Sequence, residues 1–313
     1  MKLLRKRKKR FLKAVRYGIN DFKDNPAAIK YFTGLESYEK FIFVFQSLRT
    51  DLFEVPYRNH KVKNVTLKNQ FFLTLWKLRR NTPDFELGMH FGISQTTASN
   101  VFASFVLFMA KQWGKIDIWL SRSLTDYFMP DNFKKAYPST RLIVDGTETP
   151  IAKPSNPRHQ QATFSTYTNK NTAKVLVGAT PSGLISYLSP AYGGSTSDRQ
   201  IVERSRLKEK CERGDSIMAD RGFNVQDIFA PRGIAINIPA FLKGKDHLSA
   251  KTLMEDRKLA KERVHIERLI GLTKTYKIVE QELNKYYVSI ALEIFFVCVM
   301  LCNFRENIVS KAS

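Results

Sequence analysis

Two aspartates in this 313-residue chain occupy positions where a carboxylate can do chemistry. Asp145 follows the apolar run 142–144 and precedes Gly146, while Asp220 follows the run 216–219. Each pattern predicts a short buried strand that ends at an acid. An ionised acid at the end of a buried strand is costly unless a cation or hydrogen-bond donors meet it. We therefore expect the two aspartates to share one site.

A third acid, Glu267, lies in a long helical pattern. On a helical wheel of residues 253–271, Glu267 falls between two apolar flanks, near the middle of the face that we expect to be buried. A lone carboxylate there loses its hydration. Arg263, four residues earlier, offers a structural ion pair; the other explanation is a cation that Glu267 shares with the aspartates. His265 falls on the opposite side of the wheel, so we do not count it as a ligand.

Three carboxylates suit Mg²⁺ or Mn²⁺, because these hard ions favour oxygen donors and keep water ligands that a phosphate can replace. Two such ions about 4 Å apart activate a nucleophile and stabilise the leaving oxygen in an in-line displacement at phosphorus. In that chemistry Asp145 would bridge both ions, while Asp220 and Glu267 would each hold mainly one. The sequence shows no Ser-His-Asp arrangement, P-loop or dinucleotide fingerprint.

The elements that position these acids predict a catalytic α/β region over residues 141–313. Its further expected strands are 174–179, 184–188 and 234–238, and its expected helices are 250–276 and 288–308. We expect the last, apolar helix to pack under this catalytic region. Another acid, Asp198, begins a helix for which Ser195 or Ser197 is the expected N-cap. At that position we expect Asp198 to interact with the helix dipole rather than to take part in the chemistry.

A helical domain is expected over residues 31–120, before a linker at 121–140. Within it, residues 82–110 predict two helices joined by a Gly-containing turn, which is the helix-turn-helix pattern. Thr82 is the expected N-cap of the first helix, with Pro83 at its first position.

The second helix of this pair begins after Ser94, its expected N-cap. Thr96 and Asn100 fall on its polar side, where they would approach base edges or phosphates. The alternative is an ordinary helical hairpin that supports the catalytic domain, because the later turns of the helix become apolar all round.

The formal net charge of +22 points to a polyanionic partner, nucleic acid first, although a merely soluble basic surface is the alternative. A basic arm over residues 1–30 includes Arg5, Lys6 and Arg7, which suit a phosphate-binding arm, a nuclear import signal or a solvated tail. The loop 153–174 mixes basic and aromatic residues. Its Arg158 and Lys170 are expected to track phosphates while its aromatic rings stack on bases, unless the loop is simply solvated.

Three scattered cysteines are too few for a disulfide framework or a zinc finger, which fits a reducing compartment. No signal peptide follows the basic start, and the most apolar stretch, 294–302, is shorter than the roughly 20 residues that span a bilayer. We expect no membrane association. The basic start favours the nucleus of a eukaryotic cell, or otherwise the cytoplasm and nucleoid.

Over residues 67–305 the chain resembles transposases of the PIF/Harbinger and IS5-like group, whose catalytic part is a DDE superfamily endonuclease. The resemblance rests on four motifs in order: Val-Asp-Gly-Thr at 144–147, Gly-Gly-Ser-Thr-Ser-Asp at 193–198, Ala-Asp-Arg-Gly-Phe at 219–223 and Arg-Val-His-Ile-Glu-Arg at 263–268. The helix-turn-helix before the first aspartate fits the same group. Relatives often carry a zinc-binding finger near the N-terminus, whereas this chain carries only the basic arm.

The resemblance implies an RNase H-like, retroviral-integrase-like core with a mixed sheet, which cuts DNA and joins transposon ends to a target. Asp145, Asp220 and Glu267 then form the catalytic and metal-binding triad, and Arg268 is a further DNA contact. The implied partners are double-stranded DNA, as terminal inverted repeats and target, a homo-oligomer of at least two copies, and a second DNA-binding protein if the arm does not find the ends.

Two other functions stay open from the sequence. One is a host-domesticated, DNA-binding regulator that retains the fold without transposition activity. The other is an RNA-directed nuclease built on the same core.

Overall fold

The computed structural model describes residues 18–48, 55–239 and 250–306, and these form two compact units. The first combines the chain up to Ile116 with Lys274–Arg305, and the second comprises Asp117–Thr273 together with Glu306. The second unit differs from the expected catalytic region, 141–313, because the helices after Lys274 belong to the first unit.

The first unit is helical. Its elements are η1 (Ile19–Phe22), α2 (Pro26–Thr33), α3 (Tyr38–Gln46), α4 (Leu67–Arg80), α5 (Asp84–Phe91), α6 (Gln95–Trp113), α14 (Lys277–Glu280), η4 (Lys285–Ile290) and α15 (Ala291–Asn303). Side-chain caps begin several of these helices; Thr66 caps α4, for example, by accepting a hydrogen bond from the Asn69 backbone. Helix α4 is buried from Gln70 to Leu78, so it forms the centre of this unit.

The apolar C-terminal helix α15 packs against α6 within the helical unit. The segment Lys285–Asn303 has a mean hydropathy of 1.8, enough for a membrane span by length and composition, but 56% of its apolar window is buried inside the protein. Its cysteines Cys298 and Cys302 are both buried. This helix therefore belongs to the helical unit.

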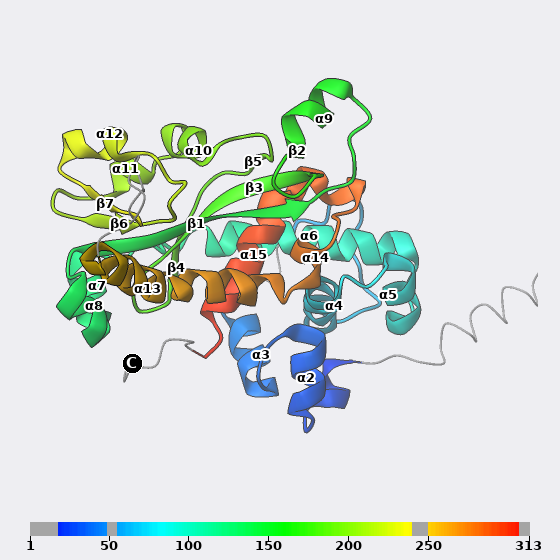
Figure 1. Ribbon diagram of the computed structural model, residues 1–313. Coiled ribbons are helices and arrows are strands. Elements are labelled where there is room, and N and C mark those ends of the chain that lie inside the picture. The colour runs from blue at the N-terminus through cyan, green and yellow to red at the C-terminus, as the bar shows by residue number, and fades with distance from the viewer. Residues whose placement is uncertain (1–17, 49–54, 240–249, 307–313) are drawn as a thin grey trace, which may run out of the picture. The chain divides into compact units, whose positions relative to one another are not determined.

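The second unit contains a mixed sheet among helices (Figure 1). Its strands are β1 (Thr140–Pro150), β2 (Phe164–Ser165), β3 (Lys170–Ala179), β4 (Ile185–Leu188), β5 (Tyr192–Gly193), β6 (Ser216–Met218) and β7 (Ala235–Asn237). Its helices are α7 (Arg122–Phe128), α8 (Asp131–Ala136), α9 (Pro157–Thr163), α10 (Asp198–Arg204), α11 (Leu207–Lys210), α12 (Gln226–Phe229), η3 (Ala230–Arg232) and α13 (Ala250–Lys274). The stretch 121–140, expected as a linker, thus contains α7 and α8.

Strand β1 is the centre of this sheet. The strand order is β2-β3-β1-β6-β7, with β4 and β5 also paired to β3. Strands β1 and β3 are antiparallel, whereas β1, β6 and β7 run parallel to one another. This mixed sheet among helices is consistent with the expected RNase H-like core.

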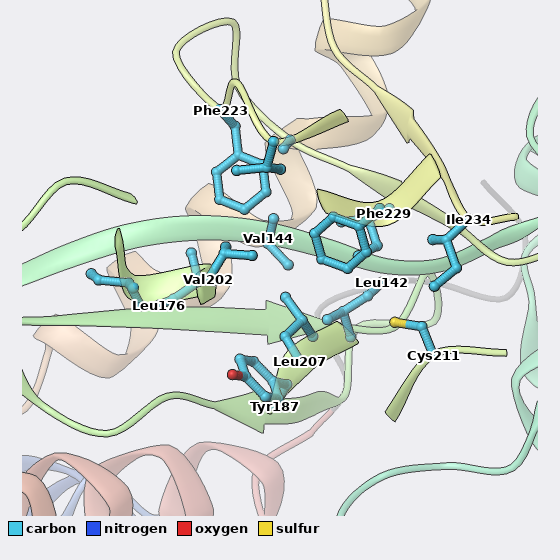
Figure 2. Close-up of a cluster of buried hydrophobic side chains, with 14 residues drawn as sticks. Leu142, Val144, Leu176, Tyr187, Val202, Leu207, Cys211, Phe223, Phe229 and Ile234 are labelled. Carbon is cyan, nitrogen blue, oxygen red and sulfur yellow. The ribbon is translucent and has the colours of Figure 1, made fainter. Parts of the chain in front are cut away.

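One face of the sheet is covered by α10, α11 and α12, whose apolar side chains fill a buried cluster (Figure 2). Leu142 and Val144 of β1 point into it, as do Ile217 of β6 and the nearby Ala219. The close approach of β1 and β3 requires Gly178, because a Cβ there would lie 2.4 Å from the Leu142 side chain. Since side chains alternate along a strand, the residues between these point to the other face.

A buried ion pair fixes the start of β1 against β6. Asp215, the residue before β6, accepts a hydrogen bond from Arg122 Nη1 at 2.9 Å, and its other carboxylate oxygen lies 3.9 Å from Arg141 Nε. Arg141 is 2% exposed and its guanidinium also packs over the Trp119 ring. Such a pair is costly to break once buried, so it favours one register between the two strands.

Candidate active site

Asp145 and Asp220 come from neighbouring parallel strands. Strands β1 and β6 are in register at Ile143 and Met218, and each aspartate follows its member of this pair by two residues. Because the side-chain period of a strand is two, both carboxylates point to the face opposite the apolar cluster. The strand register thus brings the two aspartates, which the sequence predicts to share one site, to the same level of the sheet.

Strand β1 does not end at Asp145, contrary to the expected turn at Asp145 and Gly146. It continues to Pro150 because β3 pairs with it on the antiparallel side, with Asp145 opposite Val177. Only the parallel side ends here, where β6 stops at Met218. The aspartate therefore lies in the middle of a strand but at the open end of the β1–β6 pairing.

Helix α13 supplies a cation to this pair of acids. Arg263 Nη1 donates a hydrogen bond to Asp220 Oδ1 at 2.8 Å. Arg263 is 8% exposed, and its positive charge also lowers the pKa of Asp145. The alternative pairing of Arg263 with Glu267, considered from the sequence, is therefore not the contact that this arginine makes.

The carboxyl group of Asp145 resists ionisation. Burial is the largest influence and raises its pKa from 3.8 to about 6, against the opposing charge of Arg263. The negative charges of Asp220 and Asp198 add to the increase. Asp145 thus lies in a place where a further positive charge would be stabilising.

Glu267 is exposed, not buried as the helical wheel predicted. The buried face of α13 is formed instead by Leu259, Glu262, Arg263, Ile266, Leu269, Ile270 and Thr273. The second apolar flank of the wheel, including Ala260 and Gly271, is exposed, so the buried arc is rotated away from Glu267. Arg268 is also exposed.

The buried face of α13 includes a polar cluster that the sequence did not reveal. Glu262 Oε2 accepts a hydrogen bond from Asn132 of α8 at 2.7 Å and lies 3.8 Å from His265 Nε2. Burial lowers the pKa of His265, whose ring lies 6.0 Å from that of Phe133. This cluster fastens α13 to α8, so it positions Arg263 and Glu267 without touching the aspartates.

Asp198 lies on the other face of β1. It is the first residue of α10, where Ser197 is the N-cap in a capping box with Gln200, as one of the two expected caps. Lys174 Nζ of β3 lies 2.8 Å from its Oδ1. A Cβ on Gly146 would lie 3.0 Å from the same oxygen. Asp198 therefore has a structural partner in Lys174 as well as the helix dipole.

The loop after β1 carries the basic and aromatic residues expected to meet nucleic acid. Arg158 on α9 and Lys170 at the start of β3 are both exposed, and Tyr167 in the β2–β3 turn is 93% exposed. Thr168 in the same turn donates a hydrogen bond from its hydroxyl to Glu148 Oε2 at 3.2 Å. Since Glu148 follows Asp145 by three residues on β1, the turn is tied directly to the strand that carries the first aspartate.

Helix α9 is also fastened to the sheet. Ser195 Oγ donates a hydrogen bond to the Ala162 carbonyl oxygen at 2.7 Å, and the Asn171 amide donates to the Gln160 carbonyl oxygen at 2.9 Å. Gly193 permits this approach, because a Cβ there would lie 2.0 Å from the Ala162 carbonyl oxygen. Helix α9, which carries exposed side chains of this loop, is therefore held against the sheet by hydrogen bonds.

In the helical unit, α5 and α6 meet at 100°, within the range of about 90–120° of a helix-turn-helix. Gly92 ends α5 in the left-handed conformation and Ser94 caps α6, as expected. The expected cap at Thr82 is wrong: α5 begins after Pro83, and Thr82 Oγ1 instead accepts a hydrogen bond from Trp76 Nε1.

The two residues expected to face DNA from α6 differ in exposure. Thr96 is exposed, and its hydroxyl lies 3.0 Å from that of Ser94. Asn100 is only 3% exposed, because its side chain accepts a hydrogen bond from the Asn59 backbone and donates one to the His60 carbonyl oxygen. The expectation that Asn100 reads DNA is therefore wrong. Arg5, Lys6 and Arg7 lie outside the described residues.

The donor set at the aspartates fits a hard divalent ion in part. Both donors are carboxylates, and the hydroxyl of Thr147, on the same face as Asp145, is buried without a hydrogen-bond partner among the described residues. A bound ion with its waters would give this hydroxyl a hydrogen-bond partner and would stabilise the ionised form of Asp145. Among these same residues, however, no three His, Cys, Asp or Glu side chains are grouped to hold one ion.

A mixed sheet with Asp145 on β1 and Asp220 just after the parallel strand β6, together with a helix-turn-helix, is consistent with a transposase-derived endonuclease domain. Residues 144–303, more than half of the chain, match the family described as DDE superfamily endonuclease, and residues 63–114 match the helix-turn-helix of DDE superfamily endonuclease. The chain belongs to the DDE superfamily endonucleases. No curated protein and no solved structure shows a significant match to it.

Proposed function

We propose that this protein is a DNA transposase of the PIF/Harbinger and IS5-like group, which cuts DNA at transposon ends and joins those ends to a target. The observation that carries the proposal is the pair Asp145 and Asp220, which follow one registered residue pair of β1 and β6 and face the same side. This is the arrangement in which two carboxylates can share cations.

Asp145, Asp220 and Glu267 would hold Mg²⁺ or Mn²⁺ in this protein. When bound, these ions supply an activated water and stabilise charge on the phosphate oxygens. Asp145 supplies the most buried carboxylate of the three, with a pKa of about 6, so it is the one most stabilised by a nearby cation.

Glu267 is the third ligand in this proposal because of its place on α13. It follows Arg263 by four residues, so the two side chains share one side of the helix. A helical side chain also leans over the turn that precedes it, which directs Glu267 back toward the turn of Arg263 and its partner Asp220. Its exposure leaves the carboxylate free to turn toward an ion.

The DNA contacts of the proposal come from several exposed basic and polar residues. They are Thr96 on α6, Arg158 and Lys170 beside the β2–β3 turn, Arg268 on α13, and Arg5, Lys6 and Arg7 of the basic arm. Tyr167, at the exposed turn, would stack on an unpaired base. We propose that the protein acts as at least a dimer in the nucleus, with a second DNA-binding protein where the arm does not suffice.

The test is cleavage of double-stranded DNA taken from both sides of the gene, with Mg²⁺ as the only divalent ion. We expect cuts at a pair of inverted repeats, followed by joining of the released ends to a second DNA. Cleavage of RNA or of RNA–DNA hybrids in preference to duplex DNA would favour the RNA-directed nuclease instead.

A second function is favoured by one observation, the absence of a three-acid group among the residues that the structure describes. A host-domesticated regulator would bind DNA through the helix-turn-helix and the basic residues without cutting it. It predicts salt-sensitive DNA binding and no Mg²⁺-dependent cleavage under conditions where the protein is folded and bound.

A further inference from the structure

Arg263 places a buried positive charge against Asp220, near enough to Asp145 to lower the pKa of that carboxyl. Its Nη1 lies 2.8 Å from Asp220 Oδ1, and its charge is the strongest influence that keeps Asp145 ionised. The arginine is the buried partner, with a side chain 10% exposed, while that of Asp220 is 62% exposed. Arg263 thus holds a buried positive charge against an exposed candidate metal ligand.

The contact between Arg263 and Asp220 is incomplete for an arginine–carboxylate pair. Only one guanidinium nitrogen reaches the carboxylate, and Arg263 Nε is buried without an acceptor among the described residues. In the same unit Arg199 makes the full two-pronged contact, with Nη1 and Nη2 each 2.7 Å from an oxygen of Asp227. The contact between Arg263 and Asp220 thus pairs opposite charges but leaves the hydrogen bonding of the guanidinium incomplete.

We propose that Arg263 is a stand-in cation, which neutralises Asp145 and Asp220 while no divalent ion is bound and leaves them when one binds. The inference rests on the proposed function, because it assumes that these aspartates take up a divalent ion. A guanidinium and a divalent ion repel each other at such short range, so an ion on these carboxylates weakens their contact with Arg263. Release of Arg263 therefore reduces the net binding free energy of the ion, so this residue lowers the apparent affinity of the site for the metal.

The test is calorimetric titration of Mn²⁺ into the full-length, metal-free protein. Arg263→Gln removes the competing charge, and we expect it to bind Mn²⁺ at least about tenfold more tightly than the wild type. Arg263→Lys keeps the charge and is expected to stay close to the wild type. Lys261→Gln, an exposed site on the same helix, removes an equal charge and is expected to change the affinity little. Equal or weaker binding by Arg263→Gln would overturn the inference.

A second measurement does not depend on the folding of a variant. In a crystal structure of the wild type grown with Mn²⁺, the distance from Arg263 Nη1 to Asp220 Oδ1 is expected to exceed 4 Å, the limit of an ion pair. An ion on Asp145 and Asp220 with that contact still intact would overturn the inference but leave the proposed function standing. If the wild type binds no Mn²⁺, or if Asp145→Asn still binds Mn²⁺ as the wild type does, the proposed function and the inference both fail.

Discussion

Asp145 and Asp220, 75 positions apart in the sequence, each stand two residues beyond the same registered pair of the sheet, Ile143 and Met218. Two like charges are thereby brought to one face at one level. The buried Arg263 is the cation that meets them. A positive charge stabilises the ionised form of these two carboxylates, which is a property that a metal site needs.

The first prediction concerns the stability of the metal-free protein. Asp145 keeps its proton to a higher pH when folded than when unfolded, because its pKa rises from 3.8 to about 6. Between these values the folded state binds more protons, so this residue makes stability fall as pH rises, and the cost is complete above pH 6. Asp145→Asn should therefore stabilise the metal-free protein at pH 7.5, by up to about 3 kcal/mol.

Thermal unfolding in the presence of a chelator measures this effect. The gain in Tm from Asp145→Asn should be present at pH 7.5 and should disappear toward pH 4. An Asn variant that is less stable than the wild type at pH 7.5 would show that the carboxylate is already well compensated without metal.

The second prediction separates two residues of α6. Asn100→Ala leaves the Asn59 N–H and the His60 carbonyl without their partner, so it should destabilise the protein by about 1–3 kcal/mol. Thr96→Ala should leave stability unchanged and weaken DNA binding. Unfolding curves and DNA-binding titrations of both variants, at one fixed salt concentration, test this division. This division would be contradicted if Asn100→Ala were as stable as the wild type and bound DNA more weakly, while Thr96→Ala bound DNA normally.

The third prediction concerns the exposed turn of the β2–β3 hairpin. Tyr167→Ala removes a stacking surface that is 93% exposed, so binding to single-stranded or distorted DNA should weaken by about 1–3 kcal/mol with no change in Tm. The matched control is Tyr127→Ala on α7, a tyrosine 76% exposed in the same unit. Fluorescence-anisotropy titrations should distinguish the two variants. If they bind DNA equally well, the turn is a solvated loop.

Much of the catalytic unit follows from local pattern. Short apolar runs that end at an acid or at turn residues predict the core positions of β1 and β6, and the Pro-Ser-Gly turn predicts β3 and β4. The end of β1 could not be predicted in the same way. Its extension past Gly146 depends on pairing with β3, which lies some 30 residues later in the chain, and no local signal reports such a partner.

The errors at Glu267 and Asn100 share one cause. A helical wheel ranks faces by apolar content, yet the buried face of α13 contains Glu262 and Arg263, because Asn132 and Asp220 satisfy them. Asn100 is likewise buried through bonds to residues 59 and 60. Polar residues that find distant partners are indistinguishable, in the sequence, from residues that face solvent.

The most direct test of the proposed catalytic site is Mg²⁺-dependent cleavage of supercoiled DNA that carries both flanks of the gene. The account predicts that Asp145→Asn, Asp220→Asn and Glu267→Gln each reduce the cleavage rate by more than about 100-fold, since even the outer partners of metal ligands are worth about 10- to 100-fold. Asp227→Asn, a surface acid paired with Arg199, should cut like the wild type. Wild-type rates in the three active-site variants would contradict the account.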